Sequence, residues 1–544
     1  MSVDDLRDEL KRLGYLSHGI ERWFALDPWK SRTFWSELLV VAAKGAALSA
    51  VFAALPVLVI MVLRNRPLGA MEVALLAVIY IAGSFAAVFG LVLMAALVIK
   101  LRPSLPIRSP RGLALFAMLV SGVMIAAEGA WWSGFRDRSS VLEIVAAVTL
   151  FVVAFVVMSL IFAAALLSFS IHETHEIPSI RRRSVRVPLI AASALILAGL
   201  FVVPFVSADG REEQAVPEQV VVVPRTGRLA LVAVDGLSGE LFSARPQLRS
   251  AFAVVSPLEP FLYRSSPEVW ATVGTGTGPA EHRVHAVDGI VLAGSSHLVQ
   301  TISDRDFLLR RFAPALHLAS AQPLPPTVRR RAYVWEILAA RGIPSQAVNW
   351  WTSGSSEIAL TTATQEEIFG AAALERSPGP VQTAQRIDAI ALTRFLRLIS
   401  AEPRFTTVYL PALDIVLNRV PSDSATQLTA SMQEMERLAT IVGELRTRGY
   451  EIMLVGVPGP GQRGTGVLAT TFALATAPVR LVDVAPTMLA FFGFPASDEM
   501  AGRSLLRGST QPRIPSYGPR GTAVTTGHVD EEYYETLRSL GYIR

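Results

Sequence analysis

The sequence predicts two structural classes in one chain: an α-helical membrane domain with five transmembrane helices, then an α/β domain with a mostly parallel sheet and helices on both faces. The first observation is a set of five long apolar runs before residue 207. The second is an alternation of apolar strands with helical patterns after residue 226. The third is the composition, since only 17% of the 544 residues are charged, against roughly 25% in soluble proteins.

The membrane domain is expected over residues 37–207. A span needs about 20 apolar residues, and five runs reach that length: 37–63, 72–99, 113–132, 141–169 and 187–206. A polar segment, 1–36, precedes them, and we expect it to be an amphipathic helix rather than a cleavable signal.

The charge distribution predicts the orientation of these spans. The net charge is +5, but residues 1–207 hold six more basic than acidic residues, and residues 208–544 hold one fewer. Fourteen Lys and Arg lie in the N-terminal segment and the second and fourth loops, against four in the first and third loops. Basic loops stay in the cytoplasm, so we expect an integral plasma (inner) membrane protein with a cytoplasmic N-terminus. The C-terminal domain would then be extracytoplasmic (periplasmic).

Several classes of function are disfavoured by the same composition. The basic surplus sits on inner loops, so it does not indicate nucleic-acid binding. Cysteine is absent, which excludes disulfides, thiolate nucleophiles and Cys-ligated metals. Lys44 and Glu128 lie inside apolar runs, and we expect both to snorkel toward span ends. A transporter is therefore the least favoured class.

The second half begins with a linker, 208–226, continues as an α/β domain over 227–508 and ends in a tail, 509–544. The strands RLALVAVDG and FTTVYLPALD are expected to end at Asp235 and Asp414. Ligands of parallel sheets bind beyond the C-terminal ends of strands. Both carboxylates are therefore candidate site residues.

Several stretches resemble the alkaline phosphatase superfamily, in its type I phosphodiesterase/nucleotide pyrophosphatase branch. They are VAVDG with SSPEVWATVGTGTGPAEHRV, VYLPALDIVLN, LVDVAPTMLAFFGFPASDEMAGRSL, VWEILAARGIPSQAVNWW and the terminal LRSLGYI. Taken along the chain, the five stretches follow one another in the order of that branch. The resemblance covers about residues 225–544 and implies the fold of that superfamily.

The resemblance also implies two-metal phosphoryl transfer. Ser266 would be the nucleophile, capping the helix that runs through Trp270, while Asp235 and Asp414 would each ligate one metal. Each residue also has a structural interpretation. Asp before Gly is common in turns, and Ser-Pro is a regular helix start.

The sequence departs from the family pattern at the metal ligands. Asn418 stands where the family has a His four residues after the second Asp. Gly456-Val457-Pro458-Gly459 stands in place of a Ser-Asp-His-Gly run, and no His occurs between Gly459 and Gly527. Three of seven expected site groups therefore remain, which describes a degenerate metal site.

Two hypotheses follow, and they differ in class. The first is a pseudoenzyme with a binding or scaffolding role in the cell envelope, with no cofactor. Its partners would be the lipid bilayer and an anionic envelope ligand or another membrane protein. The second is an active phosphodiesterase or phosphotransferase on lipid or glycan head groups. It would need Zn, Mn, Mg or Ca, which Asp235, Asp414, Asn418 and water could hold only weakly.

Overall fold

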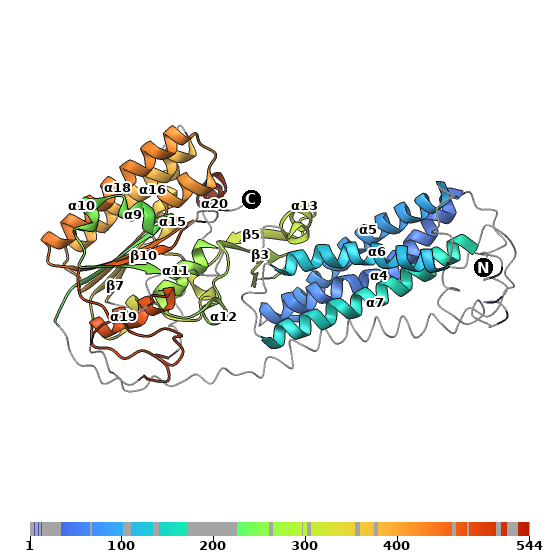
Figure 1. Cartoon of the computed structure of the whole chain (residues 1–544), viewed down its shortest axis with the longest axis horizontal. Coiled ribbons are helices and arrows are strands. Elements are labelled where there is room, and N and C mark those ends of the chain that lie inside the picture. The colour runs from blue at the N-terminus through green and yellow to red at the C-terminus, as the bar shows by residue number, and fades with distance from the viewer. Residues whose placement is uncertain are drawn as a thin grey trace. The chain divides into compact units, whose positions relative to one another are not determined.

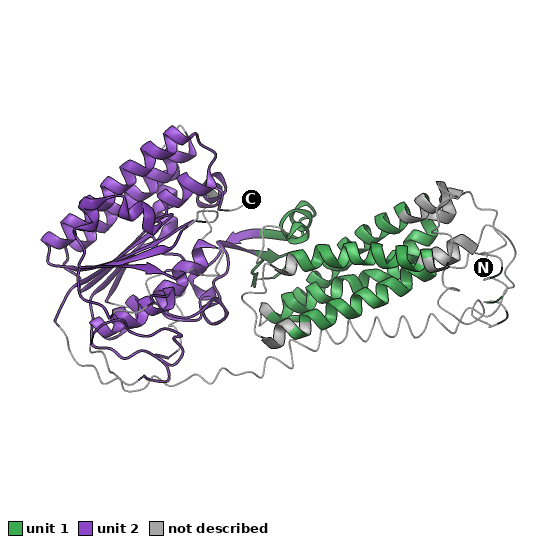
Figure 2. Cartoon of the chain, viewed as in Figure 1, with its two compact units in different colours: residues 1–211, 290–320 green, residues 212–289, 321–544 purple. Residues whose placement is uncertain are grey.

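The structure is a computed structural model of the whole chain, 1–544. It describes residues 5, 9, 12, 34–65, 68–101, 110–133, 141–171, 226–259, 265–295, 297–301, 306–353, 359–374, 379–459, 464–475, 478–507, 513–518 and 531–542. These form two compact units (Figure 2). Unit 1 comprises residues 1–211 and 290–320, and unit 2 comprises residues 212–289 and 321–544.

Unit 1 is built on four long helices (Figure 1). They are α4 (Phe34–Arg64), α5 (Ala70–Leu101), α6 (Pro110–Ser133) and α7 (Val141–Ile171). Stretches of α4, α5 and α7 are long and apolar enough to cross a membrane, whereas the apolar stretch of α6 is shorter, at Ala114–Ala130. Small residues such as Ala42 and Ala46 are fully buried in the core of this unit, where they allow close helix packing.

The helices coincide with the first four predicted spans. The fifth predicted span, 187–206, lies outside the described residues, so five spans remain a prediction. In the N-terminal segment 1–36, residues 5, 9, 12 and 34–36 are described as helical. A salt bridge of 2.8 Å joins Arg12 to Glu9 one turn earlier.

Unit 1 also contains a segment that interrupts the α/β domain in sequence, residues 290–320, which we call the docking segment. Its elements are the C-terminal part of β3 (Asp288–Leu292), β4 (Leu298–Val299), η4 (Leu308–Phe312), α13 (Ala313–Ala315) and the start of β5 (Ala319–Pro323). β3, β4 and β5 form a three-stranded sheet in the order β4-β3-β5.

Unit 2 contains a seven-stranded sheet in the order β2-β10-β9-β1-β8-β6-β7. The strands are β1 (Leu229–Asp235), β2 (Val254–Leu258), β6 (Ser345–Val348), β7 (Leu360–Ala363), β8 (Phe405–Leu410), β9 (Glu451–Val457) and β10 (Gly466–Thr470). The neighbours β9-β1-β8-β6-β7 are all parallel, and β10 is antiparallel to both β9 and β2. The predicted mostly parallel sheet is confirmed.

Helices cover both faces of this sheet (Figure 1). On one side lie α16 (Pro380–Ile399) and α18 (Ser424–Thr447), and on the other lie α11 (Ser266–Thr275) and α19 (Val484–Phe491). Every residue of β1 is buried, as expected for a strand covered on both faces.

The remaining elements of unit 2 are short. They are α9 (Gly239–Ser243), α10 (Pro246–Arg249), α12 (Pro279–His282), η5 (Pro326–Val328), α14 (Val334–Ala340), α15 (Gln365–Leu374), α17 (Ala412–Asp414), η6 (Ile415–Arg419), η7 (Leu481–Asp483) and α20 (Glu531–Ser539).

One predicted strand is shorter than expected. The stretch FTTVYLPALD was expected to run as a strand to Asp414, but β8 ends at Leu410. Pro411 cannot donate to a sheet ladder, and it begins the turn into α17. Asp414 is therefore the last residue of a helical turn beyond the strand.

Candidate functional site

The site lies at the C-terminal edge of the parallel sheet, and its first residue is Asp235, which ends β1. Gly236 follows in the left-handed region, with φ of 83°. A Cβ at Gly236 would lie 2.4 Å from the backbone N of Asp414. Only glycine allows this turn to approach Asp414 so closely, so the turn brings the two carboxylates together.

Ser266 is the first residue of α11, and the preceding residue caps the helix. Ser265 accepts a hydrogen bond from the backbone N of Glu268 and completes a capping box with that residue. The expectation that Ser266 caps the helix is therefore wrong. The physical reason is that Pro267 takes the N1/N2 position, which leaves the Ser266 hydroxyl free of a capping role.

Asp414 is bound by two side chains from the helical turn that follows it. Asn418 Nδ2 donates to Asp414 Oδ1 at 2.9 Å, and Arg419 Nε donates to Asp414 Oδ2. Residues 415–419 form a π-helix, whose wider turn brings residue i+5 beside residue i. This local geometry places both Asn418 and Arg419 against Asp414.

Arg419 joins Asp414 to the candidate nucleophile. Its Nη2 donates to Ser266 Oγ at 2.6 Å, while its Nε pairs with Asp414. Only 14% of the Arg419 side chain is exposed. A guanidinium thus occupies the space between the two residues that the resemblance would place around a metal ion.

Two tyrosines complete the surroundings. Tyr409 OH donates to Asp235 Oδ2 at 2.9 Å. The guanidinium of Arg419 lies 4.1 Å from the ring centroid of Tyr542, a cation–π contact. Gly541 has φ of 74°, and a Cβ added there would lie 3.2 Å from the Arg419 carbonyl oxygen. The described end of the chain therefore packs directly on Arg419.

Burial and neighbouring charge shift the ionisation of the site. Burial, and then the charge of Asp414, raise the pKa of Asp235 to about 7, although Arg419, Ser266 and Tyr409 act in the opposite direction. Burial alone would lower the pKa of the Arg419 guanidinium, but Asp414, Tyr542, Asp235 and Tyr409 together outweigh it and raise that pKa. Arg419 therefore stays protonated at any working pH, and Asp235 titrates near neutrality.

The residues present do not fit the metal that the resemblance implies. Both oxygens of Asp414 already accept hydrogen bonds from Asn418 and Arg419, and one oxygen of Asp235 accepts from Tyr409. Within the described part of the chain, no three His, Asp or Glu side chains are grouped so that they could hold a metal ion. A cationic guanidinium between the ligand positions would also repel a divalent ion.

The loop after β9 closes the same side of the site. A Cβ at Gly459 would lie 2.0 Å from Asp414 Oδ1 and 2.2 Å from Asn418 Nδ2. The backbone therefore passes directly over Asp414, where the family pattern has an Asp-His pair. No side chain from this position fits beside Asp414 in this arrangement.

The site is closed as well as charged. Asp235, Ser266 and Asp414 are 3%, 7% and 0% exposed. The Ser266 hydroxyl accepts a hydrogen bond from Arg419 and acts to lower the pKa of Asp235. Chemically, the arrangement holds a serine between a carboxylate that can accept its proton and a fixed cation, with little room for a substrate.

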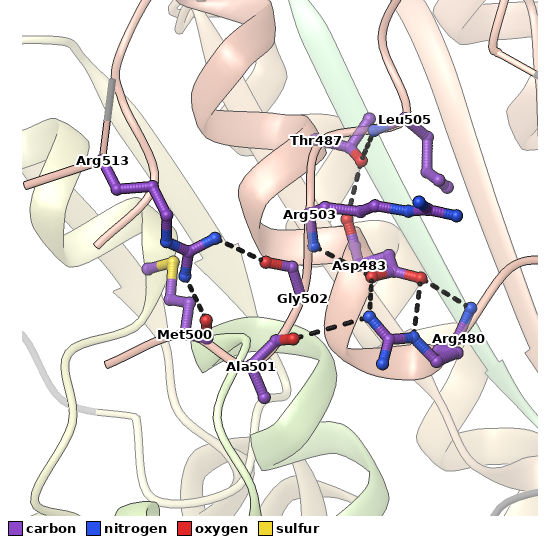
Figure 3. A network of polar contacts seen from close by, with 9 residues as sticks. All are labelled: Arg480, Asp483, Thr487, Met500, Ala501, Gly502, Arg503, Leu505 and Arg513. Carbon is purple, nitrogen blue, oxygen red and sulfur yellow. Dashed lines mark hydrogen bonds and ion pairs between the residues drawn. The ribbon is translucent and has the colours of Figure 1, made fainter. Parts of the chain in front are cut away.

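The opposite end of α11 is held by a separate polar network, shown in Figure 3. Asp483 accepts hydrogen bonds from the backbone N atoms of Arg480 and Arg503, both at 2.9 Å, and forms an ion pair with the Arg480 side chain. Ala501 N donates to the carbonyl of Gly276, the residue that caps α11. The segment around Gly502 thus fixes the end of the helix that begins at Ser266.

Sequence reasoning identified part of this site and missed the rest. Asp235, Ser266, Asp414 and Asn418 do lie together. Arg419, Tyr409 and Tyr542 were not identified. A signal existed for Arg419, since a cation directly after a lost ligand position is a plausible replacement for the metal charge. Tyr542 lies within LRSLGYI, but nothing in the sequence indicated its contact with Arg419.

Comparison with known proteins supports the fold assignment. A sequence model of the type I phosphodiesterase / nucleotide pyrophosphatase family matches residues 229–456. This family belongs to the alkaline phosphatase superfamily, and residues 229–456 of the α/β unit are similar to it. No curated protein matches the sequence significantly.

Solved structures are similar only at a distance. A 2-O GAG sulfatase (BT1596) matches 53% of this chain and 76% of its own length, with 12% identity and a TM-score of 0.35. Phosphonoacetate hydrolase from Sinorhizobium meliloti 1021 matches 44% of this chain and 59% of its own, with 14% identity and a TM-score of 0.31. Murine ectonucleotide pyrophosphatase / phosphodiesterase 5, in an inactive form with AMP, matches 42% and 56%, with 11% identity and a TM-score of 0.28.

Proposed function

We propose that this protein is a membrane-anchored pseudoenzyme, in which a phosphodiesterase-like domain has a binding or scaffolding role. The observation that carries the proposal is the placement of Arg419. Its guanidinium bridges Asp414 and Ser266, so it supplies inside the fold the positive charge that a catalytic metal would otherwise supply. The site is thereby satisfied without an ion and without a substrate.

The location of the protein is part of this proposal. Three apolar helices indicate association with a membrane. The excess of basic residues in the N-terminal segment and the second and fourth loops supports a cytoplasmic N-terminus in the plasma (inner) membrane. The α/β unit would then face the periplasm, where an anionic envelope ligand or another membrane protein is its partner.

An active phosphodiesterase or phosphotransferase on lipid or glycan head groups is the second candidate. One observation favours it. Asp235 has a pKa of about 7, on which the neighbouring Ser266 hydroxyl acts, so it could accept the proton of that hydroxyl near neutral pH. Burial of the site and the engagement of Ser266 Oγ by Arg419 weigh against this candidate.

The discriminating experiment uses the full chain purified in detergent. Its metal content is measured by elemental analysis, and its turnover of bis-p-nitrophenyl phosphate is followed at pH 6, 7 and 8. We expect no stoichiometric transition metal and the same background rate in wild type and Ser266→Ala. Turnover that Ser266→Ala abolishes and Thr440→Ala, a change on the exposed face of α18, retains would contradict the proposal.

A further inference from the structure

The docking segment, residues 290–320, lies within the α/β domain in sequence but packs in unit 1. Its contacts begin at the connection between α4 and α5. The side-chain amide of Asn65 brackets the backbone of Gln300: Gln300 N donates to Asn65 Oδ1 at 2.7 Å, and Asn65 Nδ2 donates to the Gln300 carbonyl at 3.4 Å. This pair is specific in geometry, because it uses both ends of one amide.

The contacts continue along α5. Glu72 Oε1 accepts hydrogen bonds from Ser295 Oγ at 2.6 Å and from His297 Nδ1 at 2.8 Å. Further along the helix, Tyr80 OH donates to Asp306 Oδ2 at 2.6 Å. Glu72 is 5% exposed and Asp306 is 4% exposed. Buried polar groups in native proteins are nearly always hydrogen-bonded. The paired Glu72 and Asp306 therefore indicate a specific packing contact.

An apolar contact follows the polar ones. Gly83 faces the side chain of Leu308, and a Cβ at Gly83 would lie 2.4 Å from Leu308 Cδ2. Leu309, the next residue of η4, is fully buried. The close approach depends on glycine, since a larger side chain would overlap the leucine. The segment therefore matches α5 in shape as well as in hydrogen bonding.

We propose that residues 290–320 dock the α/β domain non-covalently onto the α4–α5 end of the membrane helices. The segment is joined to unit 2 at both ends, through residues 289 and 321. The α4–α5 connection and the α/β domain must then lie on the same side of the membrane. The sidedness of the α/β domain is thus inferred from the contacts of residues 290–320, independently of the number of basic residues in the loops.

The docking has a consequence for the number of membrane crossings. If α4, α5, α6 and α7 each cross once, the chain leaves α7 on the side opposite to the α4–α5 connection. The polypeptide must therefore cross once more before the α/β domain begins. The apolar run 187–206 in the sequence supplies that crossing. Sidedness and docking are thus one testable proposal.

Sidedness is tested with single cysteines, which the Cys-free chain makes unambiguous. Ala70→Cys reports on the α4–α5 connection, Ser424→Cys on the α/β domain and Ser104→Cys on the sequence between α5 and α6. A membrane-impermeant maleimide is added to spheroplasts. We expect positions 70 and 424 to react and position 104 to react only after permeabilisation. Labelling of 70 and 424 from opposite sides would overturn the proposal.

Docking itself is tested by cutting the linker. A protease site inserted within 208–226 separates the helices from the α/β fragment, and retention on an N-terminally tagged column is measured. We expect the cleaved wild type to retain the fragment. Gly83→Leu should lose retention at least tenfold, while Gly90→Leu, a matched change on α5 where a Cβ would meet nothing within 4 Å, should keep it.

A second readout guards against a variant that fails to fold. In Asn65→Cys/Gln300→Cys, a short bismaleimide should join the two fragments after linker cleavage, so that the full-length band survives. Release of the wild-type fragment on cleavage, equal retention in the two glycine variants, or no cross-link between positions 65 and 300 would each contradict docking. None of these outcomes depends on catalysis or metal content, so they leave the pseudoenzyme proposal separately testable.

Discussion

The two ends of α11 follow different rules. At its C-terminal end, Asp483 and the segment around Gly502 hold the helix through backbone hydrogen bonds. At its N-terminal end, Ser266 accepts a hydrogen bond from Arg419, and the loop at Gly459 lies against Asp414. One end of the helix is thus held by backbone hydrogen bonds and the other is set among buried charges, so the two ends should respond differently to substitution.

The largest effect is expected from Arg419→Ala, at the N-terminal end. Removing the guanidinium leaves Asp414, which is fully buried, without its cation. Breaking a buried ion pair in this way costs about 3–5 kcal/mol. Thermal unfolding in detergent should show a large loss in melting temperature, while Arg448→Ala, which removes a half-buried pair with Glu444 at the end of α18, should change it little.

A double variant sharpens this result. Asp414→Asn combined with Arg419→Met removes both charges, so its melting temperature should lie above that of Arg419→Ala alone. An equal or lower value for the double variant would show that Arg419 contributes by packing rather than by pairing with Asp414.

A change at the C-terminal end should be nearly as costly. A Cβ at Gly502 would lie 1.9 Å from the backbone oxygen of Val482, and this overlap cannot be relieved by a side-chain rotation. We expect Gly502→Ala to destabilise the α/β domain by about 3 kcal/mol, measured by denaturant unfolding. Gly443→Ala, in open space on α18, should be neutral or slightly stabilising. Equal effects of the two changes would contradict the structural role of this segment.

Asp483→Ala tests the hydrogen bonds of the same end. The substitution leaves the backbone N atoms of Arg480 and Arg503 without their acceptor, at a cost of about 1–3 kcal/mol. Asp498→Ala removes an exposed pair with Arg513 and is expected to change stability by less than about 0.5 kcal/mol. Comparable losses in both variants would show that the network in Figure 3 is not specific.

A further effect, at Asp235, depends on pH. The pKa of Asp235 is raised to about 7 in the folded protein, from roughly 3.9 in an unfolded chain. Between these values the native state binds the extra proton, so stability falls as pH rises from about 4 to 7. Asp235→Asn should therefore melt like wild type at pH 4.5 and higher than wild type at pH 8. A difference that does not vary with pH would contradict this ionisation.

The fold was largely predictable, because its signals are local and periodic. Long apolar runs predict membrane helices, and short apolar runs predict buried strands. The four described long helices and strands β1, β6 and β9 lie where these sequence patterns predicted them. Asp235, Ser266, Asp414 and Asn418 were found because a strand end or a family motif marks each. The contacts of Arg419 with Asp414 and Ser266 depend on a π-turn, and the contact of Tyr542 depends on tertiary packing, so a short sequence pattern does not predict either geometry.

The central claim is that Arg419 takes the place of a metal ion. The most direct test is a titration of wild-type protein with Zn²⁺ and Mn²⁺, followed by the melting temperature of the α/β domain. A ligand that binds the native state stabilises it by RT ln(1 + [L]/Kd), about 2.7 kcal/mol at one hundred times Kd. We predict no saturable rise in melting temperature for the wild type. A saturable rise that Asp235→Asn abolishes would contradict the account.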